Sequence, residues 1–368
     1  MVRWNYVKIG DVCTVERGGS PRPIDKFITD DPNGINWIKI GDATDSMYIT
    51  ETAQKIIPEG MKKSRYVQPG DFLLSNSMSF GRPYILKIDG CIHDGWLVLR
   101  DNGGVFDKRF LYYYLSSPST YQKFKNMAVG GVVNNLNSDM VRGVTVPIPK
   151  MEEQIEIVQT LDNVSNLIFL RKQQLAKLDE LVKARFVEMF GDPELNPRGL
   201  PVLPWNAVFL TTTGKLDSNA MVENGRYPFF TCAKESYKID SYAFDCEALL
   251  LAGNNAAGIY DVKHYKGKFN AYQRTYVLRL MNEKWSYILF KRQLEDKLQY
   301  LQSQSKGTNT RYLTLGILNE LRFVVPPVAE QEQFAVFVEQ TDKSKVAVQK
   351  ALDEAQLLFD SLMQKYFG

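Results

Sequence analysis

The sequence has few of the residues that bind metal ions or form disulfides. It holds only two histidines, and its four cysteines are scattered, with no CxxC pair. A structural zinc ion needs four such ligands at characteristic spacings, so we expect no zinc site and predict reduced structural thiols. No run approaches 18 apolar residues, and the first residues lack a signal-peptide core. A transmembrane helix is therefore not expected, and a cytoplasmic location is the default.

The sequence also lacks a phosphate-binding loop. No GxxxxGK[ST] run is present, and the glycine-bearing stretch 253–258 has no lysine and no helical pattern after it. A P-loop holds phosphates with that lysine and with the start of the following helix. We therefore expect no nucleotide site in this chain.

What the sequence does contain is one long segment that occurs twice. The first copy runs from Pro149 to Gly191 and the second from Pro326 to Gly368, and one constant offset in residue number aligns them without a gap. We refer to this shift, which carries Pro149 onto Pro326, as the repeat offset. Spacings of four and three alternate between apolar residues in both copies, which is typical of a coiled-coil seam. Each copy begins after a proline, ends at a glycine and predicts a helix of about 38 residues, roughly 57 Å long.

The predicted seam has apolar positions and a few polar exceptions in each copy. In the first copy the apolar positions are Ile157, Leu161, Val164, Ile168, Leu175, Leu178, Val182 and Met189, with Arg171 and Arg185 as exceptions. In the second they are Phe334, Val338, Val348, Leu352, Ala355, Phe359, Leu362 and Tyr366, with Thr341 and Lys345 as exceptions. The glutamates Glu152, Glu153 and Glu330 fall in the first helical turns, where a carboxylate stabilises the helix dipole.

Charge is distributed unevenly along the chain. The net charge is +3, but residues 151–190 and 328–367 together carry −5, so the rest of the chain carries +8. The basic surplus lies in the two segments outside the helices. This distribution favours nucleic-acid contact by those segments rather than by the helices.

The two globular segments share a skeleton. Val277–Arg279 repeats Val98–Arg100, and we interpret Trp205–Val208 as the counterpart of Trp4–Val7. The Pro/Gly-rich stretch 191–199 ends the first long helix and marks a domain boundary. Strands are predicted at Asn36–Ile40, Asp71–Leu74, Trp96–Arg100 and Gly143–Ile148, and one helix or a pair of helical turns at Phe110–Met127.

Similar skeletons that carry different loops suggest two recognition modules for different targets. If the two long helices pack antiparallel, they fix the distance and rotation between the modules. Two modules on one duplex must respect its helical turn of roughly 34 Å. A rigid spacer does this, whereas a flexible linker does not.

This layout resembles the specificity subunit of type I DNA restriction–modification systems over essentially the whole chain. The resemblance is strongest at the strand-to-helix junction Val146–Ile155, at its repeat Val324–Gln331, and at the link Phe190–Pro197. We therefore predict an α+β fold in which two α/β target recognition domains are separated by two long antiparallel helices, which form a coiled coil with an internal pseudo-twofold repeat. The predicted domains are a first target recognition domain (1–148), a central helical spacer (149–191), a second target recognition domain (192–325) and a C-terminal helical spacer (326–368).

The resemblance implies a function in DNA recognition without catalysis. Each target recognition domain would read one half of a split, asymmetric duplex sequence. The subunit would bind two methyltransferase (M) subunits, and restriction (R) subunits through them. S-adenosylmethionine, ATP and magnesium would act on those partners. In agreement, the sequence has no NPPF, NPPY or DPPY run of an adenine methyltransferase.

Residues that contact DNA are expected among the polar loop positions that the two halves do not share. Lysine and arginine bind phosphates, and arginine, asparagine, glutamine, serine and threonine read base edges. In the first half the candidates are Arg17, Ser20, Arg22, Asn76, Ser77, Ser79, Arg82, Asn134 and Asn135. In the second half they are Asn254, Asn255, Lys263, His264, Lys266, Lys268, Gln273, Arg274, Lys306, Thr308, Asn309, Thr310 and Arg311. Tyr112, Tyr113 and Tyr114 are expected to pack in the core instead.

Two alternatives remain open from the sequence. One is a recognition subunit of a different restriction system, with fused methylation and cleavage functions. The other is a scaffold whose coiled coil binds a protein and whose globular segments bind no DNA.

Overall fold

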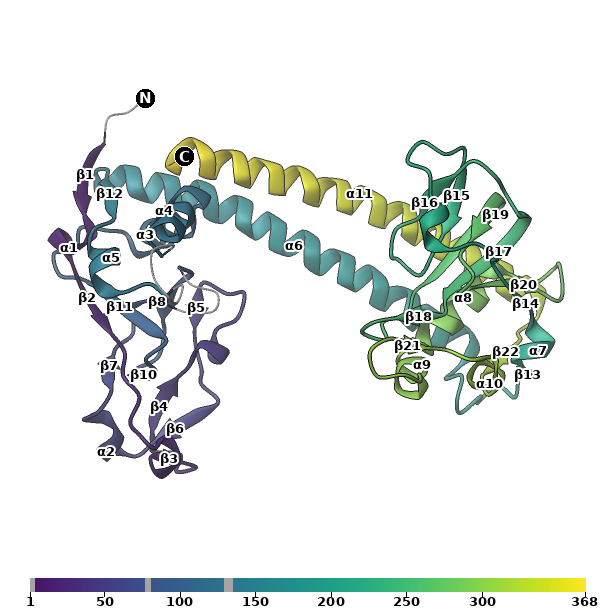
Figure 1. Ribbon diagram of the computed structural model, residues 1–368, viewed down its shortest axis with the longest axis horizontal. Helices are drawn as coiled ribbons and strands as arrows, with labels where there is room; N and C mark the ends of the chain where they lie inside the picture. The colour runs from purple at the N-terminus through teal and green to yellow at the C-terminus, as the bar shows by residue number, and fades with distance from the viewer. Residues whose placement is uncertain (1–3, 77–80, 129–134) are drawn as a thin grey trace. The chain divides into compact units, whose positions relative to one another are not determined.

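The computed structural model describes residues 4–76, 81–128 and 135–368, which form two compact units. Unit 1 comprises residues up to Arg171 together with Ala351–Gly368, and unit 2 comprises Lys172–Lys350. Each unit therefore contains one globular segment and part of both long helices (Figure 1). The long helices are α6 (Met151–Phe190) and α11 (Val328–Phe367), each of 40 residues, which confirms the two predicted helices. Among the described residues, no helix combines the length and the apolar character that a membrane span requires.

Unit 1 is built on a five-stranded sheet that is buried on both faces. Phe72, Leu74, Leu97 and Leu99 face the helices, whereas Leu73 and Val98 face a second sheet. The first sheet has the order β2 (Cys13–Arg17), β11 (Trp96–Asp101), β8 (Phe72–Ser75), β9 (Pro83–Leu86), β5 (Tyr48–Ile49). The second has the order β3 (Ile28–Thr29), β6 (Gln54–Ile56), β4 (Ile35–Ile38), β10 (Gly90–Ile92), β7 (Arg65–Val67), and β1 (Asn5–Lys8) pairs with β12 (Thr145–Ile148). The helices are α1 (Ile9–Val12), α2 (Pro58–Met61), α3 (Lys108–Ser116), α4 (Pro118–Ala128) and α5 (Ser138–Arg142).

Unit 2 repeats this plan with a single larger sheet. Leu249, Leu251 and Leu278 face the helices, and Leu250 and Val277 pack with Phe230 and Phe269 on the other face. The sheet has the order β14 (Phe209–Thr213), β20 (Thr275–Leu280), β17 (Phe244–Ala252), β19 (Val262–Ala271), β15 (Tyr227–Phe230), β16 (Tyr237–Ile239). β13 (Val202–Pro204) pairs with β22 (Arg322–Val324), and β18 (Asn254–Asn255) with β21 (Arg311–Tyr312). The helices are α7 (Trp205–Val208), α8 (Tyr287–Asp296), α9 (Leu298–Gln304) and α10 (Leu315–Asn319).

Most of the predicted elements are present with small changes in their ends. The strand predicted at Asn36–Ile40 is β4, and it gives way to a 3₁₀ turn at Ile40–Asp42. The segment Phe110–Met127 is a pair of helices, because Pro118 disfavours a helical conformation at Ser117. Ser117 is accordingly extended, with φ −66° and ψ 145°. Tyr113 and Tyr114 are buried and Tyr112 packs against the same core, as predicted.

One predicted correspondence is wrong. Strand pairing places Val7 opposite Val146 in unit 1 and Leu203 opposite Phe323 in unit 2. Because the repeat offset carries residue 146 onto residue 323, Leu203 is the counterpart of Val7, and Trp205 is the counterpart of Ile9. Both Ile9 and Trp205 begin a short helix, and their amides donate to Val144 and Leu321 respectively. Trp4 instead precedes β1, so its likeness to Trp205 is coincidental.

The predicted seam of the long helices is confirmed, since all of its apolar positions are buried or half-buried. In unit 1, Ile157 and Leu161 of α6 share a core with Met363 and Phe367 of α11. In unit 2, Phe186 and Phe190 of α6 pack against Phe334 of α11. The start of each helix therefore lies with the end of the other, which is the antiparallel arrangement.

Thr341 and Lys345, the two polar residues in the seam of α11, each have a partner that offsets the cost of burying a polar group. Thr341 is 6% exposed, and its hydroxyl donates to the carbonyl of Phe337 at 2.9 Å. Lys345 places Nζ 2.7 Å from Asp179 Oδ1 of α6 and 3.4 Å from Asp342 Oδ1. These carboxylates raise the pKa of Lys345 against the opposing effect of its burial. The seam thus contains a paired charge in place of one apolar contact.

A buried glutamine attaches each globular segment to the helix that follows it. Gln154 is fully buried; its Oε1 accepts from the amide of Asp107 at 2.9 Å, and its Nε2 donates to the carbonyls of Val105 and Pro149. Gln331, at the repeat offset from Gln154, is also fully buried and accepts from the amide of Ser286 at 3.0 Å. Asp107 and Ser286 are the N-caps of α3 and α8. The same side chain therefore joins the same two helix starts in both units.

We expect Gln154→Leu to lower the free energy of unfolding of unit 1 by about 2–3 kcal/mol, because it leaves a buried amide and buried carbonyls without partners. Urea unfolding followed by far-UV circular dichroism measures the change. Gln159→Leu, at an exposed position one turn further along α6, is the control and should change the stability little. Equal stability of the two variants would show that the glutamine does not hold the segment.

Candidate nucleic-acid interface

Four of the candidate residues of unit 1 meet at a single residue, Asp94, two at its carboxylate and two at its main-chain carbonyl. Ser20 Oγ donates to Asp94 Oδ1 at 2.9 Å, and Asn76 Nδ2 donates to the Asp94 carbonyl at 2.8 Å. Arg17 Nε donates to the same carbonyl at 3.1 Å, and Arg22 Nη2 lies 3.5 Å from Asp94 Oδ2. The structure therefore brings together polar positions that are far apart in the sequence.

Asp94 remains ionised in this setting. Burial raises its pKa, but the Ser20 hydroxyl, His93, Arg17 and Arg22 outweigh burial and hold the pKa below its ordinary value. His93 Nε2 lies 2.9 Å from Asp94 Oδ1. Because the folded pKa is lowered, the stabilisation that Asp94 provides is present above about pH 4 and is lost as the pH falls through that folded pKa. Its side chain is 31% exposed, so solvent screens this contribution.

The remaining candidates of unit 1 have different surroundings. Arg82 lies 3.3 Å from Asp45 and places its guanidinium over the ring of Tyr84. Asn135 is half-buried. Ser77, Ser79 and Asn134 lie outside the described residues.

Three loops are joined in unit 1 by main-chain hydrogen bonds around residue 76. The amide of Asn76 donates to the carbonyl of Gly95 at 2.9 Å, and the amide of Leu136 donates to the carbonyl of Asn76 at 3.0 Å. The loops after β8, before β11 and before α5 therefore lie side by side. We refer to this set as the three-loop cluster of unit 1.

Unit 2 has the same cluster with different side chains. The amide of Gly253 donates to the carbonyl of Arg274 at 2.8 Å, and the amide of Leu313 donates to the carbonyl of Gly253 at 2.8 Å. The repeat offset carries Asn76 onto Gly253 and Leu136 onto Leu313. Arg274 occupies the place of Gly95, because Val277–Arg279 in β20 matches Val98–Arg100 in β11. Equivalent backbone thus carries Asn76 in one unit and glycine in the other.

Most of the candidates of unit 2 lie in or beside this cluster. Asn254 and Asn255 in β18 pair with Tyr312 and Arg311 in β21. Asn255 Oδ1 accepts from the amides of Ala257 and Ile259, so this side chain also shapes its own loop. Arg274 is exposed, and Gln273 Nε2 lies 3.4 Å from Asp217. Lys306, Thr308, Asn309, Thr310 and Arg311 are all exposed.

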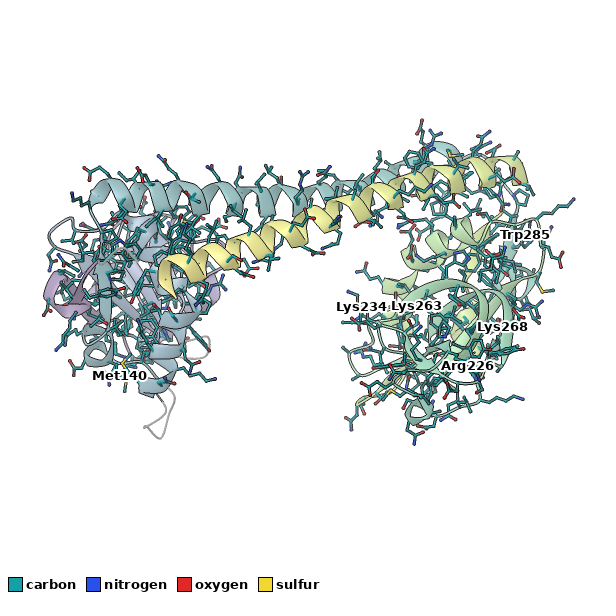
Figure 2. The ribbon with its side chains drawn as sticks, turned by 90° about the horizontal axis from the view of Figure 1, so that it is seen from above. Met140, Arg226, Lys234, Lys263, Lys268 and Trp285 are labelled. Atoms are coloured by element: carbon teal, nitrogen blue, oxygen red, sulfur yellow. The ribbon has the colours of Figure 1, made fainter. Side chains whose placement is uncertain are left out.

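Lys263 belongs to the edge of this cluster. Its Nζ donates to the carbonyl of Ala233 at 2.8 Å and to Asp261 at 2.6 Å, and its side chain is only 17% exposed. Figure 2 shows Lys263 beside Lys234, the exposed neighbour of Ala233. Lys234 is therefore a more available cation than Lys263, and the sequence patterns did not select it.

The structure does not bring His264, Lys266 and Lys268 into the cluster. They lie along β19, where His264 Nε2 and Lys266 Nζ approach the two carboxylate oxygens of Glu247 at 2.9 and 3.0 Å. Lys268 Nζ lies over the ring of Tyr242, and Arg226 lies over Tyr227, whose ring packs on Tyr242. Figure 2 labels Lys268 and Arg226 on the same part of unit 2. They form a basic and aromatic patch separate from the cluster.

Asp94 is the residue of the site that sequence reasoning missed. It lies in the turn 93–95 between β10 and β11, where an aspartate before glycine is an ordinary turn residue. A cavity of about 780 Å³ opens beside it, lined in part by Arg22, Trp37, Lys39, Gln54 and His93. No local pattern indicates that residues near positions 20, 76 and 94 are neighbours.

Comparison with known proteins identifies the family of this chain. The family model described as "Type I restriction modification DNA specificity domain" matches residues 1–180 and again 208–355. The chain belongs to this family. The two matches fall on the two halves of the internal repeat, so the family assignment and the repeated three-loop cluster agree.

Individual relatives of this family cover the chain to different extents. The type I restriction enzyme EcoDI specificity subunit of Escherichia coli is 36% identical over 160 residues, which is 41% of this chain and 35% of that protein. The MjaIX specificity subunit of Methanocaldococcus jannaschii is 23% identical over 407 residues, covering 98% of this chain and 92% of that protein. Neither alternative left open by the sequence is supported by these matches.

Solved structures show the same fold. The S subunit of a type I restriction–modification system from M. genitalium has a TM-score of 0.64 and 14% identity, covering 100% of this chain and 96% of that one. A second structure, reported in connection with complex assembly of a type I system, has a TM-score of 0.58 and 18% identity. It covers 100% of this chain and 98% of its own. The predicted architecture of two repeated α/β domains with long helices is confirmed.

We expect Asp94→Ala to loosen the loop at 18–22 without unfolding unit 1. Ser20 loses the acceptor of its hydroxyl, and Arg22 and His93 lose the carboxylate beside them, whereas the core of β8 and β11 is unchanged. The bonds of Arg17 and Asn76 to the main-chain carbonyl of residue 94 remain. Hydrogen exchange measured by mass spectrometry should show faster exchange, by about tenfold or more, in peptides that contain Gly18 to Arg22. Asp139→Ala, which removes an exposed carboxylate paired with Arg142, should leave that segment unchanged. Unchanged exchange in Asp94→Ala would show that Asp94 does not hold the loop.

Proposed function

We propose that this chain recognises a bipartite, asymmetric duplex DNA sequence, with one half-site read by each three-loop cluster. The observation that carries the proposal is the pair of equivalent main-chain hydrogen bonds at Asn76 and at Gly253, which join loops with different side chains in the two units. Equivalent frames would meet DNA in equivalent ways. Unlike side chains on them would then select unlike half-sites, which makes the site asymmetric.

The chemistry of the clusters suits base edges and phosphates. In unit 2, the amides of Asn254 and Asn309 and the guanidinium groups of Arg274 and Arg311 offer the groups that pair with adenine and guanine in the major groove. The basic and aromatic patch with Lys268 and Arg226 offers cations for phosphate contact. In unit 1, Arg17 is held by its bond to the Asp94 carbonyl, whereas the Arg22 side chain is 83% exposed beside the Asp94 carboxylate and would be available to a phosphate. A held arginine loses less conformational freedom on binding.

The long helices would act as a spacer between the two readers. Each is continuous over 40 residues and passes from one unit into the other. The two helices pack against each other along the antiparallel seam, which resists bending. The Lys345–Asp179 ion pair also favours one register of the two helices. A spacer of this kind would set the number of base pairs between the half-sites.

The chain would act with two methyltransferase subunits, and with restriction subunits through them, while having no catalysis of its own. Leu167, Phe169 and Leu170 of α6 are between 47 and 56% exposed, and the helices carry net negative charge. An apolar and acidic helix surface suits a protein partner and disfavours DNA. Adenine methylation would use S-adenosylmethionine, and cleavage ATP and magnesium, on those partners.

Loss of the gene should remove one split adenine motif from the methylome of the host. Sequencing that detects methylated bases, in strains with and without the gene, measures this directly. The expected motif has two specific parts separated by unspecified bases. An unchanged methylome in a strain whose system is otherwise active would contradict the proposal.

Arg274→Ala and Arg311→Ala should each weaken specific DNA binding by about 1–3 kcal/mol where the arginine reads a base. Where it contacts a phosphate, binding to all sequences should weaken and the salt dependence should fall. Fluorescence anisotropy with the assembled complex and the duplex motif, at two salt concentrations, separates the two cases. Arg322→Ala, an exposed position on β22 outside the cluster, is the control. Normal binding by both variants would remove the unit 2 cluster from the interface.

A further inference from the structure

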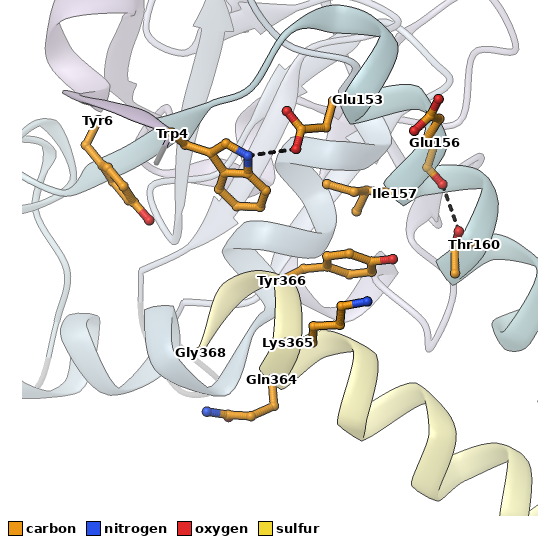
Figure 3. Close-up of a pocket in the computed structure, with 10 residues that line it drawn as sticks. All are labelled: Trp4, Tyr6, Glu153, Glu156, Ile157, Thr160, Gln364, Lys365, Tyr366 and Gly368. Carbon is orange, nitrogen blue, oxygen red and sulfur yellow. Dashed lines mark hydrogen bonds between the residues drawn. The ribbon is translucent and has the colours of Figure 1, made fainter. Parts of the chain in front are cut away.

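A pocket in unit 1 lies where the chain enters β1 and where α11 ends. Its volume is about 770 Å³. Figure 3 shows Trp4, Tyr6 and Tyr366 as aromatic walls, and Glu153 and Glu156 on the side of α6. The DNA-binding candidates do not include any of these residues. The pocket is therefore a feature that the proposed function does not use.

The equivalent place in unit 2 holds an arginine. Arg198 Nη1 and Nη2 donate to the two carboxylate oxygens of Glu330 at 2.7 and 3.1 Å. Arg198 also donates to the main-chain carbonyl of Met189, in the last turn of α6. The guanidinium is thus held by a glutamate in the first turn of one long helix and a carbonyl in the last turn of the other. The ion pair lowers the pKa of Glu330.

Both partners of Arg198 have counterparts that line the unit 1 pocket. The repeat offset relates Glu153 to Glu330, and it relates Met189 to Tyr366. The helix ends themselves match, since the amide of Gly368 donates to Gln364 at 2.9 Å and that of Gly191 to Val187 at 2.8 Å. The pocket is therefore lined by the residues that correspond to the two that hold a guanidinium in the other unit.

Among the residues that the structure describes, no arginine lines the unit 1 pocket. The register of β1 and β13 relates Val7 to Leu203, and in the sequence the same shift carries Val2 onto Arg198. In unit 1, Trp4 Nε1 donates to Glu153 Oε1 at 2.9 Å. An indole is a neutral single donor, whereas a guanidinium can bind both oxygens of a carboxylate.

We infer that the pocket is a docking site for an arginine side chain on an extended segment of another polypeptide. The guanidinium would bind Glu153 and the Tyr366 carbonyl and stack between the aromatic rings. Two glutamates at the pocket repel phosphate, so nucleic acid is not the occupant. Lys365 also lines the pocket, with its ammonium 5.4 Å from the centre of the Tyr366 ring, and it opposes the incoming cation. The inference does not depend on DNA recognition.

The chain itself provides the probe for a test. A capped peptide with the sequence of residues 192–200, which contains Arg198, is titrated into the full-length protein by isothermal calorimetry. We expect saturable binding, with affinity at least about tenfold lower for the peptide in which arginine is replaced by alanine. Equal binding of the two peptides, or no binding to the wild-type protein, would overturn the inference.

Matched variants locate the site. Glu153→Gln retains an acceptor for Trp4 but loses the charge, and it should weaken binding of the arginine peptide about tenfold while far-UV circular dichroism stays unchanged. Glu152→Gln, its exposed neighbour outside the pocket, should have no effect. Lys365→Ala should strengthen binding several-fold. Arg3 directly precedes Trp4 in the sequence, so an Arg3→Ala variant is also tested. If the peptide binds to this variant and not to the wild-type protein, Arg3 itself occupies the pocket, and the inference of an external partner is wrong.

Discussion

Two buried glutamines fix the orientation of each globular segment on the long helix that follows it. Gln154 and Gln331 lie one turn inside the long helices, yet they satisfy the amides of Asp107 and Ser286, which begin helices of the globular segments. A buried amide side chain has a high cost if a partner is lost, so helix and segment must keep one orientation. The aromatic packing of Phe334 on Phe186 and Phe190 then fixes the second helix against the first within unit 2. The position of the loops depends on this attachment.

Because each globular segment is rigidly attached to its helix, the loops can differ in sequence while the main-chain hydrogen bonds that join them are kept. The bonds that join the loops at Asn76 and at Gly253 are made by main-chain groups, so the neighbouring loop residues can differ between the units. Gly253 itself is constrained, because a Cβ there would lie 2.3 Å from the carbonyl oxygen of Arg274. Unit 1 uses this freedom to build a polar assembly on Asp94, with Ser20, Arg17 and Asn76 as donors. Unit 2 leaves Arg274 exposed and places a basic loop beside Asn254. Two different readers can thus be carried by one scaffold.

The long helices and the globular segments carry net charges of opposite sign. The helices carry net negative charge and exposed apolar residues such as Phe169, whereas the positive surplus lies in the globular segments. The proposed attraction of DNA would therefore act on the globular segments rather than on the helices. The proposed protein partners would use the helices and the pocket at Glu153, which are other surfaces.

The repeat, the two long helices, their seam and the main strands could be predicted from the sequence, because these features depend on patterns within short segments. It also selected Arg17, Ser20, Arg22 and Asn76 as polar loop residues, but it gave no reason to place them together. The folded structure was needed to show that Asp94 joins them, that Trp205 corresponds to Ile9 and not to Trp4, and that Lys268 lies apart from Arg274. Each of these depends on contacts between segments far apart in the chain, and no local pattern encodes which distant backbone group a loop will meet.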